Sequence, residues 1–482
     1  MPAMIGPPWV AAVLTALVAA IAVGTSLHAL LTKREPRAAV LWVGLIWFVP
    51  VGGGVLYVLL GINRIRRTAK RVRPDARLRG REAPRPELAA GSASISEEER
   101  HLEEIRRVVD HLTPRRLLAG NAIEPLVDGE DAYPAMLAAI DGASRSVSLL
   151  TYLFDNDRWG RRFVTALAAA ERRGAEVRVL VDDLGVRYSW PSIRRELAAA
   201  GLRYATFLPI LNPRKMTFLN LRNHRKVLVV DGHTAFTGGM NIGLRHMVDE
   251  AGRNATRDIQ FRVRGPVVTQ LQSVFADDWS FATGEQLRGS DWFPKLSELG
   301  TVAARAITDG PDDELDNLRW TILAALTAAR SRVCIVTPYF LPDATLIAAM
   351  NMAAMRGVEV DVVLPEKSNL PYVHWATFAL LWQVLEHGCR VWLTPPPFDH
   401  SKLMLVDGCW ALVGSTNWDP RALRLNFELN LECYDRGFAG LVGELCDARL
   451  QQARPLVKAD VDRRSLPVRI RDGVARLFIP YL

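Results

Sequence analysis

Cysteine is scarce in this sequence, and the few cysteines present are not spaced as metal ligands or as a disulfide framework. There are 5 in 482 residues. All fall in the second half, and no two form a C-x-x-C pair: Cys334, Cys389, Cys409, Cys433 and Cys446. An odd, scattered set argues against a disulfide scaffold and a cysteine-based zinc centre. It indicates buried free thiols and a reducing compartment for the catalytic part of the chain.

A surplus of positive charge is also missing from most of the chain. The net charge is +8, yet residues 62–86 alone carry ten basic residues against Asp75 and Glu82, which accounts for the whole surplus. A nucleic-acid groove would spread basic residues over the folded domains, so we expect no nucleic-acid partner. The basic run suits anionic lipid headgroups, or it is a solvated tether that sets membrane topology.

Charge is almost absent from the first 61 residues. Two uncharged runs, residues 9–31 and 38–61, contain 23 and 24 residues and flank a short basic turn. Each run is long enough to cross about 30 Å of hydrocarbon as a helix, which predicts a transmembrane hairpin over these 61 residues. A buried hairpin in a soluble core is the alternative. The flank richer in Lys and Arg, after the second run, should stay cytoplasmic. Pro50 and the glycines at 52–54 should bend the second run.

The rest of the chain repeats one plan twice. A stretch rich in Pro, Gly, Ala and Arg predicts a basic juxtamembrane linker over residues 62–119. Beyond it, the apolar strands 146–154 and 332–340 are each followed by a helical segment and a second β-branched strand. Strands joined by helices predict an α/β fold. Two similar halves predict duplicated domains over 120–300 and 301–482, with mixed sheets flanked by helices and a shared site on a pseudo-twofold axis.

One motif occurs once in each half. The first copy covers residues 224–241, the second covers residues 400–417, and both follow H-x-K-x4-D-x6-G-[GS]-x-N. Five fixed positions matched twice at corresponding places are far beyond chance. A histidine and a lysine two positions apart project from the same face of a strand. The expected catalytic residues are His224, Lys226, His400 and Lys402.

Two pairs of acidic residues accompany the motif. Asp231 and Asp407 end its strand and are grouped with its catalytic residues, although the Asp-Gly sequence at each position favours a structural role in a turn. Asp258 and Glu428 lie on later strands, where polar and apolar residues alternate. A carboxylate there could accept a hydrogen bond from a catalytic histidine and fix its tautomer. An ordinary solvated strand face is the alternative.

These residues resemble the twin motif of the phospholipase D superfamily and, more narrowly, of the bacterial cardiolipin synthases within it. The resemblance extends over nearly the whole length, including the apolar N-terminal segment and residues 338–342 and 419–428. It implies an enzyme without a metal or cofactor, in which one histidine attacks phosphorus and the other is the general acid and base. It favours His224 as the nucleophile and His400 as the acid and base, and the reverse order stays open.

The resemblance also implies phosphate contacts. Asn241, Asn417 and Ser415 would hold the phosphoryl oxygens together with the two lysines. The first copy has Gly239 where the second has Ser415. The two phosphate contacts are therefore expected to be unequal.

A cardiolipin synthase is a phosphatidyltransferase that joins two phosphatidylglycerols and releases glycerol. The implied partners are phosphatidylglycerol, other anionic phospholipids and the bilayer, in the bacterial inner membrane, with multi-pass topology and cytoplasmic catalytic domains. The alternative is hydrolysis by the same residues, as in a phospholipase D or a membrane-tethered nuclease. The C-terminal residues 463–482 mix arginines with apolar residues and form a basic amphipathic tail, which lies on a membrane or packs on the domain. The oligomeric state is left open.

Overall fold

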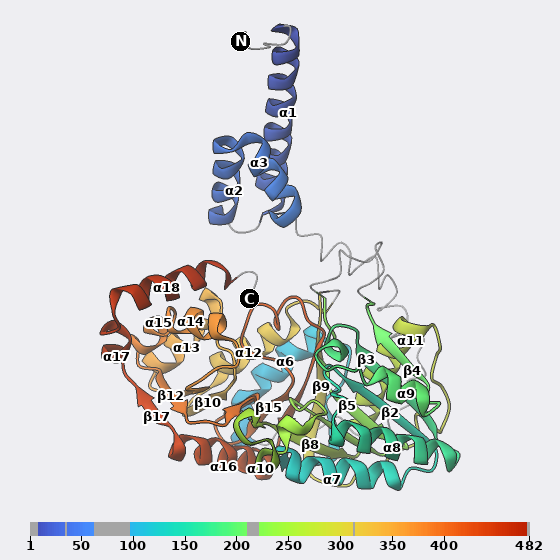
Figure 1. Ribbon diagram of the computed structural model, residues 1–482. Helices are drawn as coiled ribbons and strands as arrows, with labels where there is room; N and C mark the ends of the chain where they lie inside the picture. The colour runs from blue at the N-terminus through green and yellow to red at the C-terminus, as the bar shows by residue number, and fades with distance from the viewer. Residues whose placement is uncertain (1–7, 34–35, 62–96, 210–220, 312–313, 480–482) are drawn as a thin grey trace. The chain divides into compact units, whose positions relative to one another are not determined.

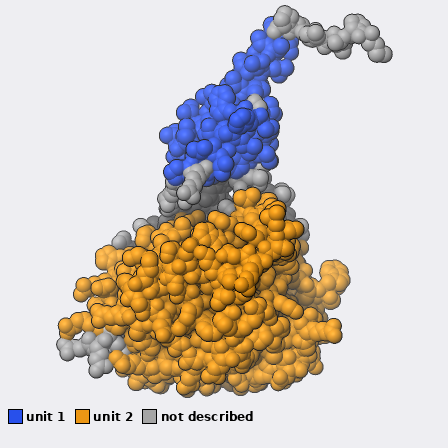
Figure 2. All heavy atoms as spheres, turned by 90° about the vertical axis from the view of Figure 1, so that its left-hand side faces the viewer, with its two compact units in different colours: residues 1–71 blue, residues 72–482 orange. Residues whose placement is uncertain are grey.

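The structure is a computed structural model that describes residues 8–33, 36–61, 97–209, 221–311 and 314–479. The chain divides into two compact units, residues 1–71 and residues 72–482 (Figure 2). The described residues of the first unit form one long α-helix, two shorter ones and a π-helical turn. Among the described residues, the second unit contains a large mixed sheet with helices around it, and a small two-stranded sheet (Figure 1).

The first unit begins with a long apolar helix, α1 (Pro8–Thr32). Within the described part of the chain, its segment Trp9–Thr32 is the one helix long and apolar enough to cross a membrane, and only 11% of its apolar window is buried. The core helix of a soluble protein would be mostly buried. The exposed apolar surface therefore fits a helix that lies in a membrane.

The second apolar run does not form the single span predicted over residues 38–61. It is divided into α2 (Pro36–Phe48), α3 (Pro50–Leu56) and the π-helix η1 (Tyr57–Gly61). A Cβ on Gly53 would lie 2.3 Å from the carbonyl oxygen of Leu45, so α3 turns back against α2 where only glycine fits. The proline at the start of α3 cannot continue the hydrogen bonding of α2. With 13 residues, α2 is about 20 Å long.

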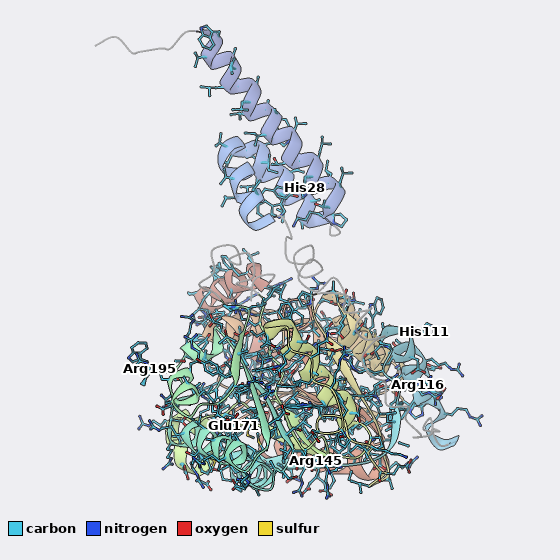
Figure 3. All side chains as sticks on the ribbon, turned by 90° about the vertical axis from the view of Figure 1, so that its right-hand side faces the viewer. His28, His111, Arg116, Arg145, Glu171 and Arg195 are labelled. Atoms are coloured by element: carbon cyan, nitrogen blue, oxygen red, sulfur yellow. The ribbon has the colours of Figure 1, made fainter. Side chains whose placement is uncertain are left out.

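A polar contact and a small apolar cluster hold the helices of the first unit together. The hydroxyl of Tyr57 lies 2.7 Å from Nδ1 of His28, which Figure 3 labels among these helices. Tyr57 is buried with Ala22, Ala29 and Ile46 in a small apolar cluster.

Residues 97–112 correct the predicted linker, which was drawn through residue 119. They form a 3-10 turn, η2 (Glu97–Leu102), and the helix α6 (Glu103–Leu112). Leu102, Ile105 and Val109 are fully buried in the core of the second half. Their spacing of three and four residues makes one apolar helical face. Composition alone does not predict this face, because polar residues separate the three apolar ones.

The second unit is built on one continuous 15-stranded sheet. Its order is β17-β12-β11-β10-β14-β15-β16-β9-β1-β8-β6-β5-β2-β3-β4. The strands of the first half are β1 (Leu118–Val127), β2 (Ser146–Thr151), β3 (Glu176–Asp182), β4 (Tyr204–Phe207), β5 (Val227–Val230), β6 (Thr234–Gly238) and β8 (Ile259–Arg264). Those of the second half are β9 (Val302–Asp309), β10 (Arg332–Val336), β11 (Glu359–Pro365), β12 (Arg390–Thr394), β14 (Leu403–Val406), β15 (Trp410–Gly414), β16 (Glu428–Tyr434) and the edge strand β17 (Arg454–Leu456).

The two halves follow the same order from the middle of the sheet outwards. In the first half β2, β3 and β4 are parallel, and β5, β6 and β8 are antiparallel neighbours. The second half repeats this with β10, β11 and β12, then β14, β15 and β16. The halves meet where β1 pairs with β9 in antiparallel register. The sheet is therefore mixed and duplicated, as predicted, but the two domains share it without a break.

Helices cover both faces of the sheet. The described helices of the first half are α7 (Asp128–Asp141), α8 (Arg158–Arg172), α9 (Arg194–Ala199), α10 (Val248–Ala251) and α11 (Val268–Thr283), with the short turns η3 (Gly185–Arg187), η5 (Leu244–His246) and η6 (Gly252–Asn254). Those of the second half are α12 (Asn317–Ala328), α13 (Ala344–Met355), α14 (Pro371–Phe378), α15 (Trp382–Leu385), α16 (Arg436–Gln452), α17 (Lys458–Asp462) and α18 (Leu466–Leu477). On β2, Val147 and Leu149 join the apolar cluster of α7 and α8, whereas Ser148 on the other face accepts from Gln272 of α11.

Candidate active site

The two motif histidines are held by strand pairing between the halves. The backbone N–H of His224 donates to the carbonyl of Phe427 at 2.9 Å, and the N–H of Phe427 donates to the carbonyl of Arg222. In the same way, the N–H of His400 donates to the carbonyl of Arg257 at 2.8 Å. A two-stranded parallel sheet of β7 (Thr256–Arg257) and β13 (Phe398–Asp399) leads into this second contact. These contacts bring each histidine next to a carboxylate of the opposite half, since Glu428 follows Phe427 and Asp258 follows Arg257.

The ring hydrogen bonds are crosswise. Nδ1 of His224 lies 3.1 Å from Oε1 of Glu428, and Nδ1 of His400 lies 2.8 Å from Oδ2 of Asp258. Both carboxylates are fully buried. Since a carboxylate is an acceptor, it favours the tautomer with the proton on Nδ1 and leaves a lone pair on Nε2. Asp258 and Glu428 thus occupy histidine-orienting positions, and each serves the histidine of the other half.

The motif lysines are buried next to their histidines. Nζ of Lys226 donates to the carbonyl of His224 at 2.5 Å, and Nζ of Lys402 donates to the carbonyl of His400. Nζ of Lys402 also lies 2.7 Å from Nδ1 of His400. At this distance the ammonium charge of Lys402 opposes protonation of the His400 ring. Burial lowers the pKa of Lys226 to about 7 and that of Lys402 to about 8.

The two histidine–carboxylate pairs are electrostatically unequal. Burial lowers the pKa of His224, with Glu428 opposing it, and lowers the pKa of His400 further, with both lysines contributing. Burial would raise the pKa of Glu428, but His224, Lys226 and Ser415 outweigh it and the pKa falls. The pKa of Asp258 rises because burial outweighs Lys402. Glu428 is therefore the more firmly ionised of the two carboxylates.

The hydrogen bonds around the carboxylates explain this inequality. Glu428 accepts from the Ser415 hydroxyl and, at 3.1 Å, from the Asn426 amide. Asp258 accepts from the Ile259 N–H at 2.8 Å. A Cβ on Gly239 would lie 2.4 Å from Oδ1 of Asp258, so a serine there would collide with the carboxylate. Position 239 is therefore glycine because the Asp258 carboxylate lies too close for a side chain. At position 415 the Glu428 carboxylate leaves room for a serine, which donates to it.

The Ser415 hydroxyl binds groups of the protein, whereas the sequence predicts that it contacts phosphate. Its Oγ donates to Glu428 and accepts from the N–H of Leu429 at 3.0 Å. With 1% of its surface exposed, the residue has both hydrogen-bonding functions engaged by the protein. Ser415 therefore supports the carboxylate of Glu428.

The two motif asparagines are buried at equivalent positions after β6 and β15. Oδ1 of Asn241 accepts from the N–H of Leu153 at 2.9 Å, which leaves its amide N–H groups as donors. Among the described residues, Oδ1 of Asn417 is buried without a hydrogen-bond partner. Both side chains are compatible with the predicted phosphate contacts.

The sequence profile of the family described as "Cardiolipin synthase, PLD-like domain" matches residues 136–279 and 322–447, more than half of the chain. The chain belongs to this family. Both motif copies and both orienting carboxylates lie inside the matched segments. The profile described as "Phospholipase_D-nuclease N-terminal" matches residues 13–61.

Curated members of this cardiolipin synthase family match nearly the whole chain. The major cardiolipin synthase of Bacillus subtilis (strain 168) is 30% identical over 93% of this chain and 95% of its own length. A cardiolipin synthase of Oceanobacillus iheyensis is 29% identical over 94% of this chain and 95% of its own. The crystal structure of a phosphatidylserine synthase from Haemophilus influenzae Rd KW20 superposes with a TM-score of 0.59 at 16% identity, over 79% of this chain and all of that one. This last likeness concerns the fold.

In this family member the motif aspartates lie in turns. Asp231 accepts from the backbone N–H groups of Ser144, Arg145 and Ser146, all between 2.8 and 3.2 Å. Asp407 accepts likewise from the N–H groups of residues 330–332. Both have φ of 52°, and a left-handed glycine follows each, as the Asp-Gly sequence predicts. Their grouping with the catalytic residues is corrected, because their carboxylates bind the backbone of the turn and, at Asp407, Nε2 of His101 at 2.9 Å, and not the motif histidines.

Replacing Asp231 by alanine is therefore expected to lower stability without changing the chemistry. Losing the hydrogen bonds from three backbone N–H groups and the Ser144 hydroxyl, and placing alanine at a positive φ, should cost about 2 to 4 kcal/mol of unfolding free energy. Denaturant melts of detergent-solubilised protein would measure this. Asp231→Asn, which tolerates positive φ and keeps an acceptor, is the matched control and should lose less. A large fall in kcat for correctly folded Asp231→Ala would contradict the turn assignment.

Three residues near the histidines were not predicted from the sequence as site residues. The ring of Tyr152 lies 5.2 Å from that of His224, and the ring of Tyr339 lies 6.1 Å from that of His400. Both tyrosines follow the first parallel strand of their half, a position at which sites in α/β sheets gather. His246 is 1% exposed, and burial, partly opposed by Asp258, lowers its pKa to about 3. Sequence spacing does not predict His246 as a site residue, because the turn η5 brings it near the histidines.

Within the ranges that the structure describes, no group of three or more His, Cys, Asp or Glu side chains could hold a metal ion. The five cysteines are buried and free.

Proposed function

We propose that this protein transfers the phosphatidyl group of one phosphatidylglycerol to a second, giving cardiolipin and glycerol. The observation that carries the proposal is the crosswise pair of buried histidine–carboxylate hydrogen bonds. Each bond engages Nδ1, so Nε2 of one imidazole is available to attack phosphorus and Nε2 of the other to carry and deliver a proton, as a two-step displacement requires. The family membership supports the choice of a phosphatidyl group, since the curated relatives are cardiolipin synthases.

In the first step, Nε2 of His224 attacks phosphorus while His400, protonated at Nε2, donates that proton to the departing glycerol oxygen. The P–O bond to the headgroup breaks and a P–N bond forms. In the second step, Nε2 of His400 takes the proton from a hydroxyl of the second phosphatidylglycerol, whose oxygen attacks phosphorus. The P–N bond breaks, His224 is restored, and His400 is again protonated. Water in place of the second lipid would give phosphatidic acid.

The unequal carboxylates support His224 as the nucleophile. Positive charge develops on the attacking imidazole as its Nε2 bonds to phosphorus. Glu428, whose pKa is lowered by His224, Lys226 and Ser415 and which also accepts from the Asn426 amide, is suited to stabilise that charge. Asp258, whose pKa is raised, suits a histidine that gains and loses a proton during the cycle. Lys226, Lys402, Asn241 and Asn417 would hold the non-bridging phosphoryl oxygens.

The test is incubation of purified full-length protein with phosphatidylglycerol in detergent, with lipid products separated and glycerol quantified. Equal amounts of cardiolipin and glycerol are expected. Phosphatidic acid as the main lipid product would overturn the transferase in favour of a hydrolase. No turnover of any phosphodiester would overturn the enzyme assignment altogether.

The pKa values of the site predict the pH dependence. The lysines must be charged to hold an anionic phosphate, so kcat/KM is full below their pKa values of about 7 and about 8 and falls as pH rises through them. His224 must be neutral to attack phosphorus and its pKa is lowered, so the acid limb lies below the ordinary 6.5. Lys402→Arg stays charged, so it should remove the part of the fall near pH 8 and keep the part near pH 7 that belongs to Lys226. An unchanged alkaline limb would contradict the role of Lys402.

We further propose that the first 61 residues anchor the chain in the bacterial cell membrane as a multi-pass segment, with the catalytic unit in the cytoplasm. The basic surplus of residues 62–86 supports this orientation. Single cysteines introduced at Glu35 and at Arg81 provide the test, because the native cysteines are buried. In intact spheroplasts an impermeant maleimide should label position 35 and should label position 81 only after permeabilisation. The reverse pattern would overturn the orientation.

A further inference from the structure

The C-terminal helix α18 carries its apolar residues on the outside of the catalytic unit. Leu466, Ile470 and Leu477 share one side of the helix and are 67%, 58% and 74% exposed. Val474 and Phe478 widen the stripe and are also at least half exposed. Figure 1 shows α18 on the outside of the second half, where it packs against α14. We call these five side chains the α18 stripe.

The opposite side of α18 holds the helix to the domain through charged and small residues. Asp472 is 1% exposed and is bound by Arg464 and, at 2.8 Å, by Arg471. The Arg471 guanidinium stacks over the ring of Trp375 in α14 at 4.5 Å. Ala475 is buried in the small apolar cluster beneath. A helix that serves only the core would place its leucines inward, and α18 does the reverse.

The charge around the α18 stripe selects a partner. Residues 463–479 contain five arginines and one acidic residue, and that residue, Asp472, is the buried one. Arg463, Arg469 and Arg476 are exposed. Arg469 and Arg476 are seven residues apart and border the stripe along one edge. An apolar stripe edged by guanidinium groups matches the boundary between acyl chains and anionic headgroups.

We propose that α18 lies in the surface of an anionic phospholipid bilayer, with its stripe among the acyl chains and its arginines among the phosphates. A second copy of the chain is a poorer occupant, because it would bring the same cationic surface against itself. The exposed Tyr372 of α14 and Trp382 at the start of α15 add aromatic side chains to this end of the second half. The choice of phosphatidylglycerol as the lipid rests on the proposed function. The insertion of α18 does not depend on it.

Depth measurement on the full-length protein tests this directly. Ile470→Cys carries a nitroxide label, and Leu299→Cys, an equally exposed apolar site outside the stripe at 59%, is the matched control. In nanodiscs of phosphatidylglycerol and phosphatidylethanolamine, the ratio of oxygen to water-soluble nickel accessibility should be about threefold or more higher at 470 than at 299. In phosphatidylcholine nanodiscs the ratio at 470 should fall.

Equal nickel accessibility at the two positions in anionic nanodiscs would overturn the proposal. Protection at 470 that comes with spin–spin broadening between copies would also overturn it, in favour of a self-interface. Protection that is the same in both lipid compositions would overturn the selection of anionic lipid.

A double variant gives a functional measurement. Ile470→Gln with Leu477→Gln should raise the KM for lipid in bilayers several-fold and leave turnover of a short-chain soluble phosphodiester unchanged, whereas Leu299→Gln should change neither. Loss of activity on both substrates would point to damage of the fold and contradict a surface role. If the protein turned over no phosphatidylglycerol, the depth measurement would still decide the position of α18.

Discussion

Replacing His224 by alanine is expected to lower turnover of phosphatidylglycerol by on the order of 10⁴-fold or more. The variant loses the atom that bonds to phosphorus, and residues that act as a catalytic unit lose most of their effect when one is removed. Steady-state cardiolipin formation in detergent measures this loss. His400→Ala should be comparably impaired, because the acceptor hydroxyl then has no base.

The control for these variants is His233→Ala. His233 is an exposed residue of the turn after β5, and its ring contacts the carbonyl of Asp231. It should keep normal activity. A His224→Ala enzyme with more than about one tenth of normal turnover could not use the covalent route.

The second large effect is expected from Glu428→Gln. An amide at this position can still meet Nδ1 of His224, but it is neutral and can present a donor where the imidazole needs an acceptor. The imidazole then loses both the favoured tautomer and the charge that stabilises its attack. We expect kcat to fall by about 10²-fold or more, with the phosphohistidine-forming step affected first. Pre-steady-state measurement of glycerol release reports that step.

Glu432→Gln is a matched control on the same face of the same strand. Glu432 is also fully buried, but its partner is Arg305, outside the site. Its loss should lower stability and leave the first chemical step of the folded enzyme unchanged. If Glu428→Gln and Glu432→Gln impaired the first step equally, the positioning role of Glu428 would be contradicted.

The crosswise geometry predicts that each carboxylate variant impairs the histidine of the opposite half, whereas two separate half-sites would not show this effect. Asp258→Asn lies in the first half, yet it should impair His400 and therefore proton transfer. Glu428→Gln lies in the second half, yet it should impair His224. Substrates whose leaving group needs no proton separate the two effects: Asp258→Asn should release such a leaving group normally in the first step, and Glu428→Gln should not.

Much of this site could be predicted from residue spacing. Histidine and lysine two positions apart on a strand have to share a face, and polar alternation singled out Asp258 and Glu428 before any contact was known. The crosswise pairing could not be predicted, because it depends on β1 and β9 joining the halves at the centre of one sheet. The role of Ser415 was missed for a similar reason: its partner, Glu428, lies on the neighbouring strand.

The errors outside the site have local causes. The sequence predicts linker over residues 97–112 because many charged residues separate the three apolar positions of its buried face, Leu102, Ile105 and Val109. The second apolar run has the length of a span, but Pro50 and the close approach of Gly53 to Leu45 divide it. Length and hydropathy alone do not register such breaks.

The central claim is that His224 receives the phosphatidyl group in a site completed by both halves. The most direct measurement uses His400→Ala with a phosphatidyl ester of p-nitrophenol, whose departure needs no proton. A burst of one nitrophenolate per chain, with the phosphatidyl group mapped by mass spectrometry to His224, is the predicted result, and His224→Ala should show no burst. A burst in His224→Ala with the group on His400, or turnover without any modified histidine, would contradict the account.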